Sequence, residues 1–114
     1  MAKVSIAESL KNEILKKFKE ESKIIFRQMY SLGNNPHKGK SLGNVGGIVI
    51  KEIRYKSFRF YFITDGYKLK MMDESKLVDL LIKFVRMSDK KDQQQTINDI
   101  KKILLNFGFE GFND

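Results

Sequence analysis

The sequence predicts an α+β fold, in which amino-terminal helices pack on a small antiparallel sheet of three to four strands and a carboxyl-terminal helix follows. Three observations predict this class. Apolar residues recur at helical spacing in the first third of the chain, alternate in the middle third, and return to helical spacing near the carboxyl end. Since the 114 residues contain neither a repeat nor a linker, we expect residues 1–114 to form a single domain.

In the first third, neither glycine nor proline interrupts residues 6–32. Ser5 and Glu8 have the spacing of a capping box, and Gly33 suits a helix stop. The pattern permits one long helix or a helical hairpin hinged near residues 20–22, and we favour the hairpin because a 27-residue helix would be long for so small a domain. The apolar stripe consists of Ile6, Leu10, Ile14, Phe18, Ile25, Met29 and Leu32.

The middle third predicts strands over residues 48–55 and 58–64, joined by a turn at residues 56–57. Asp65 and Gly66 form a hairpin signal, which predicts a returning strand over residues 67–71.

Residues 79–87 alternate again and are interpreted as a further strand, although their pattern also fits a helix. Asp89 is expected to cap a last helix over residues 90–106, which Gly108 ends. The three phenylalanines of the tail that follows are expected to pack back on the domain.

Composition excludes several kinds of site. Cysteine is absent, which excludes disulfides, thiolate metal sites and a cysteine nucleophile, and the single histidine, His37, excludes a multi-histidine metal site within one chain. Carboxylates do not cluster, so we expect neither a metal nor a small-molecule cofactor. No apolar run is long enough for a signal peptide or a membrane span, so we expect a cytoplasmic protein with no membrane partner.

The formal net charge of +8 favours a polyanionic partner, for which we expect RNA. The alternative is that a lysine-rich surface only keeps a small protein in solution. The positions of the basic residues are more informative than the net charge. Three of the four arginines fall in predicted strands: Arg54, Arg59 and Arg86.

Alternation along the predicted strands separates two kinds of side chain. Phe58, Phe60 and Phe62 share one face, which we expect to carry the core. Arg59, Tyr61 and Ile63 share the other. A cationic face with interleaved aromatic rings suits a phosphate backbone and stacked bases, although arginine is also ordinary on a solvent-facing sheet. RNA carries its own nucleophile, the 2′-hydroxyl, so such a face could also cleave it with a base, a cation and an acid.

Three segments in this order resemble the RelE/ParE toxin superfamily over about residues 8–106: NPHKGKSL from Asn35, IRYKSFRFYFI from Ile53, and FVRMSDKK from Phe84. The resemblance implies a small antiparallel sheet with a helical hairpin on one face. For the RelE branch it implies a toxin that cleaves mRNA in the ribosomal decoding site without a metal, using the 2′-hydroxyl as nucleophile, and an antitoxin protein as cognate partner.

The resemblance also implies roles for single residues. Arg59 matches the arginine that stabilises the phosphate, and Arg86 matches the basic residue at the leaving group. Lys51 lies one residue out of register with the family's lysines proposed as base, and Lys83 is the alternative base. We expect four further residues to contact nucleic acid: Arg54, Tyr61, Lys90 and Lys91.

The chain also departs from the family pattern. The family's usual amino-terminal strand is reduced to residues 3–6 at most. The segment from Met71 to Asp79 is longer than the usual connection, and glutamines at residues 93–95 replace a tyrosine that some members use for stacking. ParE-like members poison gyrase and do not cut RNA. Two alternatives therefore stay open: a ParE-like toxin that binds a protein target such as gyrase, and a catalytically silent nucleic-acid-binding domain of the same fold.

Overall fold

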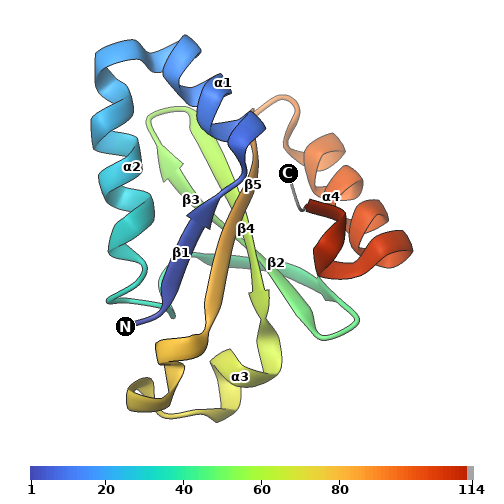
Figure 1. Cartoon of the computed structure of the whole chain (residues 1–114). Helices are drawn as coiled ribbons and strands as arrows, with labels where there is room; N and C mark the ends of the chain where they lie inside the picture. The colour runs from blue at the N-terminus through green and yellow to red at the C-terminus, as the bar shows by residue number, and fades with distance from the viewer. Residues whose placement is uncertain (113–114) are drawn as a thin grey trace.

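The computed structural model describes residues 1–112, apart from the side chain of Glu74, and shows one five-stranded sheet with helices on both faces (Figure 1). The strands lie in the spatial order β1-β5-β4-β3-β2. β1 is parallel to β5, and the other neighbouring pairs are antiparallel. The strands are β1 (Lys3–Ile6), β2 (Lys40–Val45), β3 (Ile48–Tyr55), β4 (Phe58–Asp65) and β5 (Leu81–Asp89).

Four α-helices and three short 3₁₀ helices connect these strands within the described residues. The α-helices are α1 (Glu8–Phe18), α2 (Ser22–Ser31), α3 (Gly66–Met71) and α4 (Gln93–Phe107). The 3₁₀ helices are η1 (Lys19–Glu21), η2 (Glu74–Asp79) and η3 (Gly108–Phe112). No helix in the described part of the chain is long and apolar enough to cross a membrane.

The first core lies between the sheet and the hairpin of α1 and α2, and it contains the face predicted to be apolar. Phe60 and Phe62 are fully buried there, and the ring of Phe62 lies 4.9 Å from that of Phe84, measured between centroids. The predicted helical stripe supplies the opposite side through Leu10, Ile14, Ile25, Met29 and Leu32. The prediction that the phenylalanines of β4 alternate toward the helices is confirmed.

A second core covers the other face of the sheet, which the sequence predicted to be an open cationic surface. α4 packs there on Ile50, Ile63 and Val85, and Phe112 of the tail closes one end. The prediction of an open face was wrong for this part of the sheet, because each of three strands contributes an apolar side chain beneath α4. The prediction for the tail holds for Phe112, which is buried, whereas Phe107 is 70% exposed.

The amino-terminal helices form the predicted hairpin, which breaks at η1 where Lys19 has a φ of +50°. The predicted capping box is absent, since Ser5 lies in β1 and the N-cap residue Ala7 makes no side-chain capping bond. The amide of Ala7 instead donates to the carbonyl of Phe84 at 2.9 Å. Pairing with β5 therefore keeps the chain extended beyond Ser5 and moves the start of the helix.

The sheet differs from the predicted antiparallel sheet of three to four strands. It has five strands and is mixed, because β1 pairs with β5 in parallel and β2 pairs with β3. β1 has only four residues, and β2 contains a register shift between Ser41 and Gly43, where Gly43 has a φ of +142°. Neither segment has the regular alternation that identifies a strand in a sequence.

The returning strand predicted over residues 67–71 was wrong, since this segment lies in α3. Asp65 caps that helix by accepting a hydrogen bond from the amide of Lys68 at 3.1 Å. β4 is already flanked by β3 and by β5, so no sheet edge remains for a returning strand. β5 begins two residues later than predicted, and the N-cap position of α4 is Asp92 rather than Asp89. Asp92 makes no side-chain capping bond, and its amide donates to Asp89 Oδ1 at 2.9 Å.

An exposed ion pair ties the helical hinge to the turn between β3 and β4. The Glu21 carboxylate accepts hydrogen bonds from Lys56 Nζ at 3.0 Å and from the Tyr55 hydroxyl at 3.0 Å. These bonds, that from Lys56 first, hold the pKa of Glu21 below its ordinary value of 4.5. The folded state therefore favours the carboxylate, and its stabilising contribution is present above pH 4.5 and is lost as the pH falls toward the lowered pKa.

We expect Glu21→Gln to lower the free energy of unfolding at neutral pH, and the loss relative to the unsubstituted chain to shrink as the pH falls below 4.5. Added salt should also reduce the loss, because both charged groups are exposed. Urea unfolding from neutral to acidic pH measures the difference. Glu20→Gln is the matched control, since Glu20 is exposed and forms none of the ion pairs found among the described residues. An equal loss in both variants would contradict the assignment.

Candidate nucleic-acid interface

Three rows of side chains cross the α4 face of the sheet on β3, β4 and β5. Residues that pair directly across antiparallel strands project to the same face, so the observed register defines each row. In the order β3, β4, β5, row one is Arg54, Arg59 and Ser88; row two is Glu52, Tyr61 and Arg86; row three is Ile50, Ile63 and Lys83.

A bulge between β4 and β5 brings Arg86 into row two. Phe62 pairs with Phe84, whereas Tyr61 pairs with Arg86, so Val85 is the extra residue. Strict alternation would have placed Arg86 on the same face as Phe84, beneath the helical hairpin. The bulge thus turns a second arginine toward the face that carries Arg59.

α4 packs on the apolar residues of row three and also on Tyr61 of row two, which is fully buried. The buried residues Ile97, Ile100 and Leu104 pack with Ile50 and Ile63. Rows one and two therefore form the part of this face where polar groups gather. β5 leads through a short turn into the amino-terminal end of α4 (Figure 1), where Gln93 contacts Glu52 of row two.

A buried carboxylate sits between two arginines in these rows. Glu52 is 1% exposed, and its Oε2 lies 3.3 Å from Arg54 Nε and 3.7 Å from Arg59 Nε. Gln93, in the first turn of α4, donates to Glu52 Oε1 at 3.4 Å. The like charges of Arg54 and Arg59, which lie directly opposite each other, are thus bridged by one anion.

The guanidinium of Arg59 is incompletely satisfied. Its side chain is buried, and its Nη1 donates to the carbonyl of Ser57 at 3.3 Å. Its Nε has no hydrogen-bond partner among the described residues, since 3.7 Å to Glu52 is too long for a hydrogen bond. A buried donor without a partner is rare in folded proteins and indicates a role beyond packing.

Tyr61 and Ser88 complete the polar part of these rows. The Tyr61 hydroxyl lies 2.7 Å from Ser88 Oγ, and Ser88 Oγ donates to the carbonyl of Asp89 at 2.9 Å. Ser88 has one proton to donate, so Tyr61 is the donor to Ser88. Burial raises the pKa of Tyr61, with the bond to Ser88 acting in the opposite direction, so the hydroxyl keeps its proton at neutral pH.

Arg86 is half-buried at the edge of row two. Its Nη1 donates to the carbonyl of Val85 at 2.7 Å, and its guanidinium carbon lies 5.2 Å from the centroid of the Phe112 ring. Neither contact neutralises its charge. Arg86 therefore presents a cation beside Tyr61 on the face that carries Glu52 and Arg59.

A hollow of about 290 Å³ opens beside Glu52, which pairs with the first residue of β2, Lys40, so that the edge of β3 beyond Glu52 has no strand beside it. Two cations, Lys38 and Arg54, line it together with Gly39, Ile53 and Gln28 of α2. Its volume is near the lower end of the range of ligand pockets. A phosphate group with part of its sugar could therefore approach Glu52 from this side.

Of the two lysines expected to act as a base, neither is brought to this cluster. Lys51 lies on the opposite face, where its Nζ donates to the carbonyl of His37 at 2.8 Å and burial lowers its pKa. Lys83 shares the face of Arg59 but stands in row three, roughly 14 Å from row one along the strands.

The remaining residues expected at the site lie at one end of the sheet. Lys90 and Lys91 are exposed in the turn between β5 and α4, and Asp89 at the end of β5 pairs with Phe58 at the start of β4. The exposed side chain of Arg54 lies near the same end. These three exposed cations, Arg54, Lys90 and Lys91, form a basic border at the end of the sheet that carries row one.

Glu52 is the residue that the sequence interpretation missed. The sequence held the information needed to place Glu52, because a two-residue turn at Lys56–Ser57 pairs Arg54 with Arg59 and Glu52 with Tyr61. A carboxylate in an apolar strand, on the face that carries the arginines, then follows from alternation. No group of three or more His, Cys, Asp or Glu residues in the part of the chain described is arranged to hold a metal ion.

The fold and the cluster define a small α+β protein with a carboxylate–arginine site on a sheet face. Comparison with known proteins adds no assignment, since the chain matches no protein-family model, no curated protein and no solved structure. A function for the chain must therefore be inferred from the cluster and from the resemblance of its strands to the RelE/ParE superfamily.

Proposed function

We propose that the chain is a RelE-like toxin, an endoribonuclease that cleaves ribosome-bound mRNA through the 2′-hydroxyl. One observation carries the proposal: a buried carboxylate, two arginines bound to it, a tyrosine hydroxyl and a third arginine share one sheet face. These are the groups that such cleavage needs, and each can act without a metal.

In this proposal Glu52 takes the place of a lysine as the base. Its carboxylate removes the proton of the 2′-hydroxyl, and the 2′-oxygen attacks the adjacent phosphorus. The bond from phosphorus to the 5′-oxygen breaks, which leaves a 2′,3′-cyclic phosphate and a 5′-hydroxyl. The departing oxygen takes a proton from Tyr61, whose hydroxyl is protonated at neutral pH, with Arg86 beside it as a stabilising cation.

Arg59 stabilises the charge that develops on the phosphate. Its Nε lacks a hydrogen-bond partner among the described residues, and a phosphate oxygen would supply one. The exposed cations Arg54, Lys90 and Lys91 hold the flanking backbone, and binding through them weakens with salt because counterions are released. A cognate antitoxin with an acidic segment would cover this same surface.

The proposal is tested by toe-printing a translated mRNA with the purified protein. Glu52→Gln keeps the shape of the side chain and should slow cutting in the decoding site by about 10²–10⁴-fold. Arg59→Lys keeps the positive charge but loses the planar guanidinium, which can donate two parallel hydrogen bonds to a phosphate, and it should also slow cutting. Glu13→Gln and Arg27→Lys are matched controls on exposed helical positions and should leave cutting unchanged.

Circular dichroism and thermal unfolding establish that each variant is folded before cutting is compared. Cutting that survives both Glu52→Gln and Arg59→Lys would contradict the proposed site. No cutting by the folded unsubstituted chain on active ribosomes would contradict the activity itself.

A second candidate function follows from the burial of the cluster. Glu52, Arg59 and Tyr61 are each less than a tenth exposed, whereas the cations around them are exposed. A catalytically silent domain that binds RNA through this basic border is therefore the alternative. It predicts RNA binding that weakens with salt and is lost in Lys90→Ala with Lys91→Ala, without cleavage products. Stalled replication with intact translation would instead favour a ParE-like toxin.

A further inference from the structure

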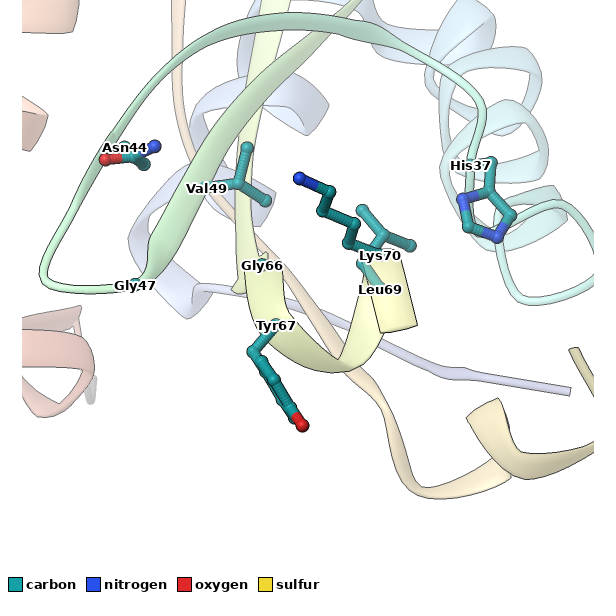
Figure 2. Close-up of a pocket in the computed structure, with 8 residues that line it drawn as sticks. All are labelled: His37, Asn44, Gly47, Val49, Gly66, Tyr67, Leu69 and Lys70. Carbon is teal, nitrogen blue, oxygen red and sulfur yellow. The ribbon is translucent and has the colours of Figure 1, made fainter. Parts of the chain in front are cut away.

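A second hollow, of about 520 Å³, lies on the opposite face of the sheet from the carboxylate–arginine cluster. The hairpin of β2 and β3 forms one wall, α3 a second and the loop carrying His37 a third (Figure 2). This volume suits a small organic molecule. Val49 and Leu69 supply its apolar lining, and both pack against the first core.

Glycines keep the wall between α3 and the hairpin closed. The amide of Gly66 donates to the carbonyl of Gly47 at 2.8 Å, and a Cβ on Gly66 would approach that oxygen to 2.9 Å. Gly47 has a φ of +86°, and a Cβ built there would meet no atom within 4 Å. Only glycine combines this turn with so close an approach of the two chains.

The hollow carries the positive charge of Lys70 without a matching carboxylate. Lys70 extends from α3 toward Val49, with His37 across the opening, whereas Tyr67 points away from the centre (Figure 2). No Asp or Glu is among the residues that line the hollow. Neither Lys70 nor His37 forms an ion pair within the described part of the chain.

A buried ammonium lies directly behind the His37 wall. Lys51 is 6% exposed, its Nζ donates to the backbone carbonyl of His37 at 2.8 Å, and the ring of Phe62 lies 5.9 Å from it. It has no carboxylate partner among the described residues, and burial lowers its pKa. A buried cation without a counter-ion is costly, and an anion in the hollow would offset that cost.

We propose that this hollow binds a small phosphorylated compound through its phosphate group, which Lys70 and His37 contact. A phosphate monoester carries a charge of about −1.5 to −2 at neutral pH, which matches the two ammonium groups of Lys70 and, behind the His37 wall, Lys51 better than a single carboxylate does. The remainder of the compound lies on Val49 and Leu69. This site is separate from the RNA-cleaving site proposed above, because the sheet lies between them.

The test is an NMR titration of the full chain with ribose 5-phosphate, with ribose as the uncharged probe. Saturable shifts are expected with ribose 5-phosphate at the backbone amides of Asn44, Gly47, Gly66 and Lys70, and none with ribose. Lys70→Met should weaken binding by roughly tenfold or more, the effect of losing one hydrogen bond to a charged group.

Lys68→Met is the matched control, because Lys68 is exposed on the same helix but does not line this hollow. It should bind ribose 5-phosphate as the unsubstituted chain does. Equal weakening by Lys68→Met and Lys70→Met, equal binding of ribose, or no saturable shift would each overturn the proposal. Lys70 is exposed, so its substitution leaves the fold intact.

Discussion

Replacing Arg59 by methionine is expected to lower the free energy of unfolding at neutral pH by about 3–5 kcal/mol, the range for breaking one side of a buried ion pair. Methionine fills the space of the arginine stem but leaves the Glu52 carboxylate, 1% exposed, with one cation fewer. The remaining partner, Arg54, is exposed on a side chain that water screens. Urea unfolding followed by circular dichroism measures the change.

Arg54→Met is the control for this result, since it removes a cation from the same carboxylate but from an exposed position. It should cost at most about 1 kcal/mol, as exposed ion pairs do. The double variant Glu52→Gln with Arg59→Met should recover part of the loss, because it no longer buries an unpaired charge. A loss below about 1 kcal/mol in Arg59→Met would show that Glu52 and Arg59 are not coupled in the folded chain.

Because Arg59 is part of a buried ion pair, some substitutions of Arg59 cannot test activity alone. A truncation such as Arg59→Ala combines the loss of a phosphate contact with the loss of a structural ion pair. Lack of cleavage in that variant would therefore not separate catalysis from unfolding. Arg59→Lys keeps a cation beside Glu52 and is the substitution in which a loss of cutting reports most directly on the chemistry, whereas Glu52→Gln leaves Arg59 without its anion and is interpreted only together with its measured stability.

Phe62→Ala is expected to lower the free energy of unfolding by about 3–5 kcal/mol, because it leaves a cavity in the middle of the first core. Phe62 is fully buried, and its ring lies against Phe84 and close to the backbone of Gly39. It is also the residue at which the β4–β5 register shifts. The measurement is again urea unfolding.

Phe107→Ala is the matched control, since it makes the same substitution at a ring that is 70% exposed. It should change the free energy of unfolding by at most about 0.5 kcal/mol, the range for surface substitutions. Similar losses in the two variants would contradict the assignment of Phe62 to the core.

The local patterns that are regular over many residues were interpreted correctly. The alternation of β3 and β4, their two-residue turn and the apolar stripes of the helices each follow from the period of a regular backbone. The face that carries Phe60 and Phe62 followed from the same rule. These features depend on neighbours close in the chain, which is why the sequence sufficed to predict them.

Elements held by distant partners were missed or misassigned. β1 and β2 are short or irregular strands that exist because β5 and β3 offer them edges. Residues 67–71 alternate as a strand does, yet they form a helix because both sides of β4 are already paired. In each case long-range pairing overrode a local signal.

In the candidate site, too, the local pattern placed some residues and long-range pairing placed others. Alternation along the chain was enough to put Arg59 and Tyr61 on one face, and the register of the β3–β4 turn added Glu52 and Arg54. The same register puts Lys51, which pairs with Phe62, on the other face, whereas only the tertiary structure brought Arg86 to the face of Arg59, through the bulge at Val85. The physical reason is that side-chain direction has a period of two, so one extra residue in a strand reverses the face of all that follow, and packing between strands decides where that residue lies.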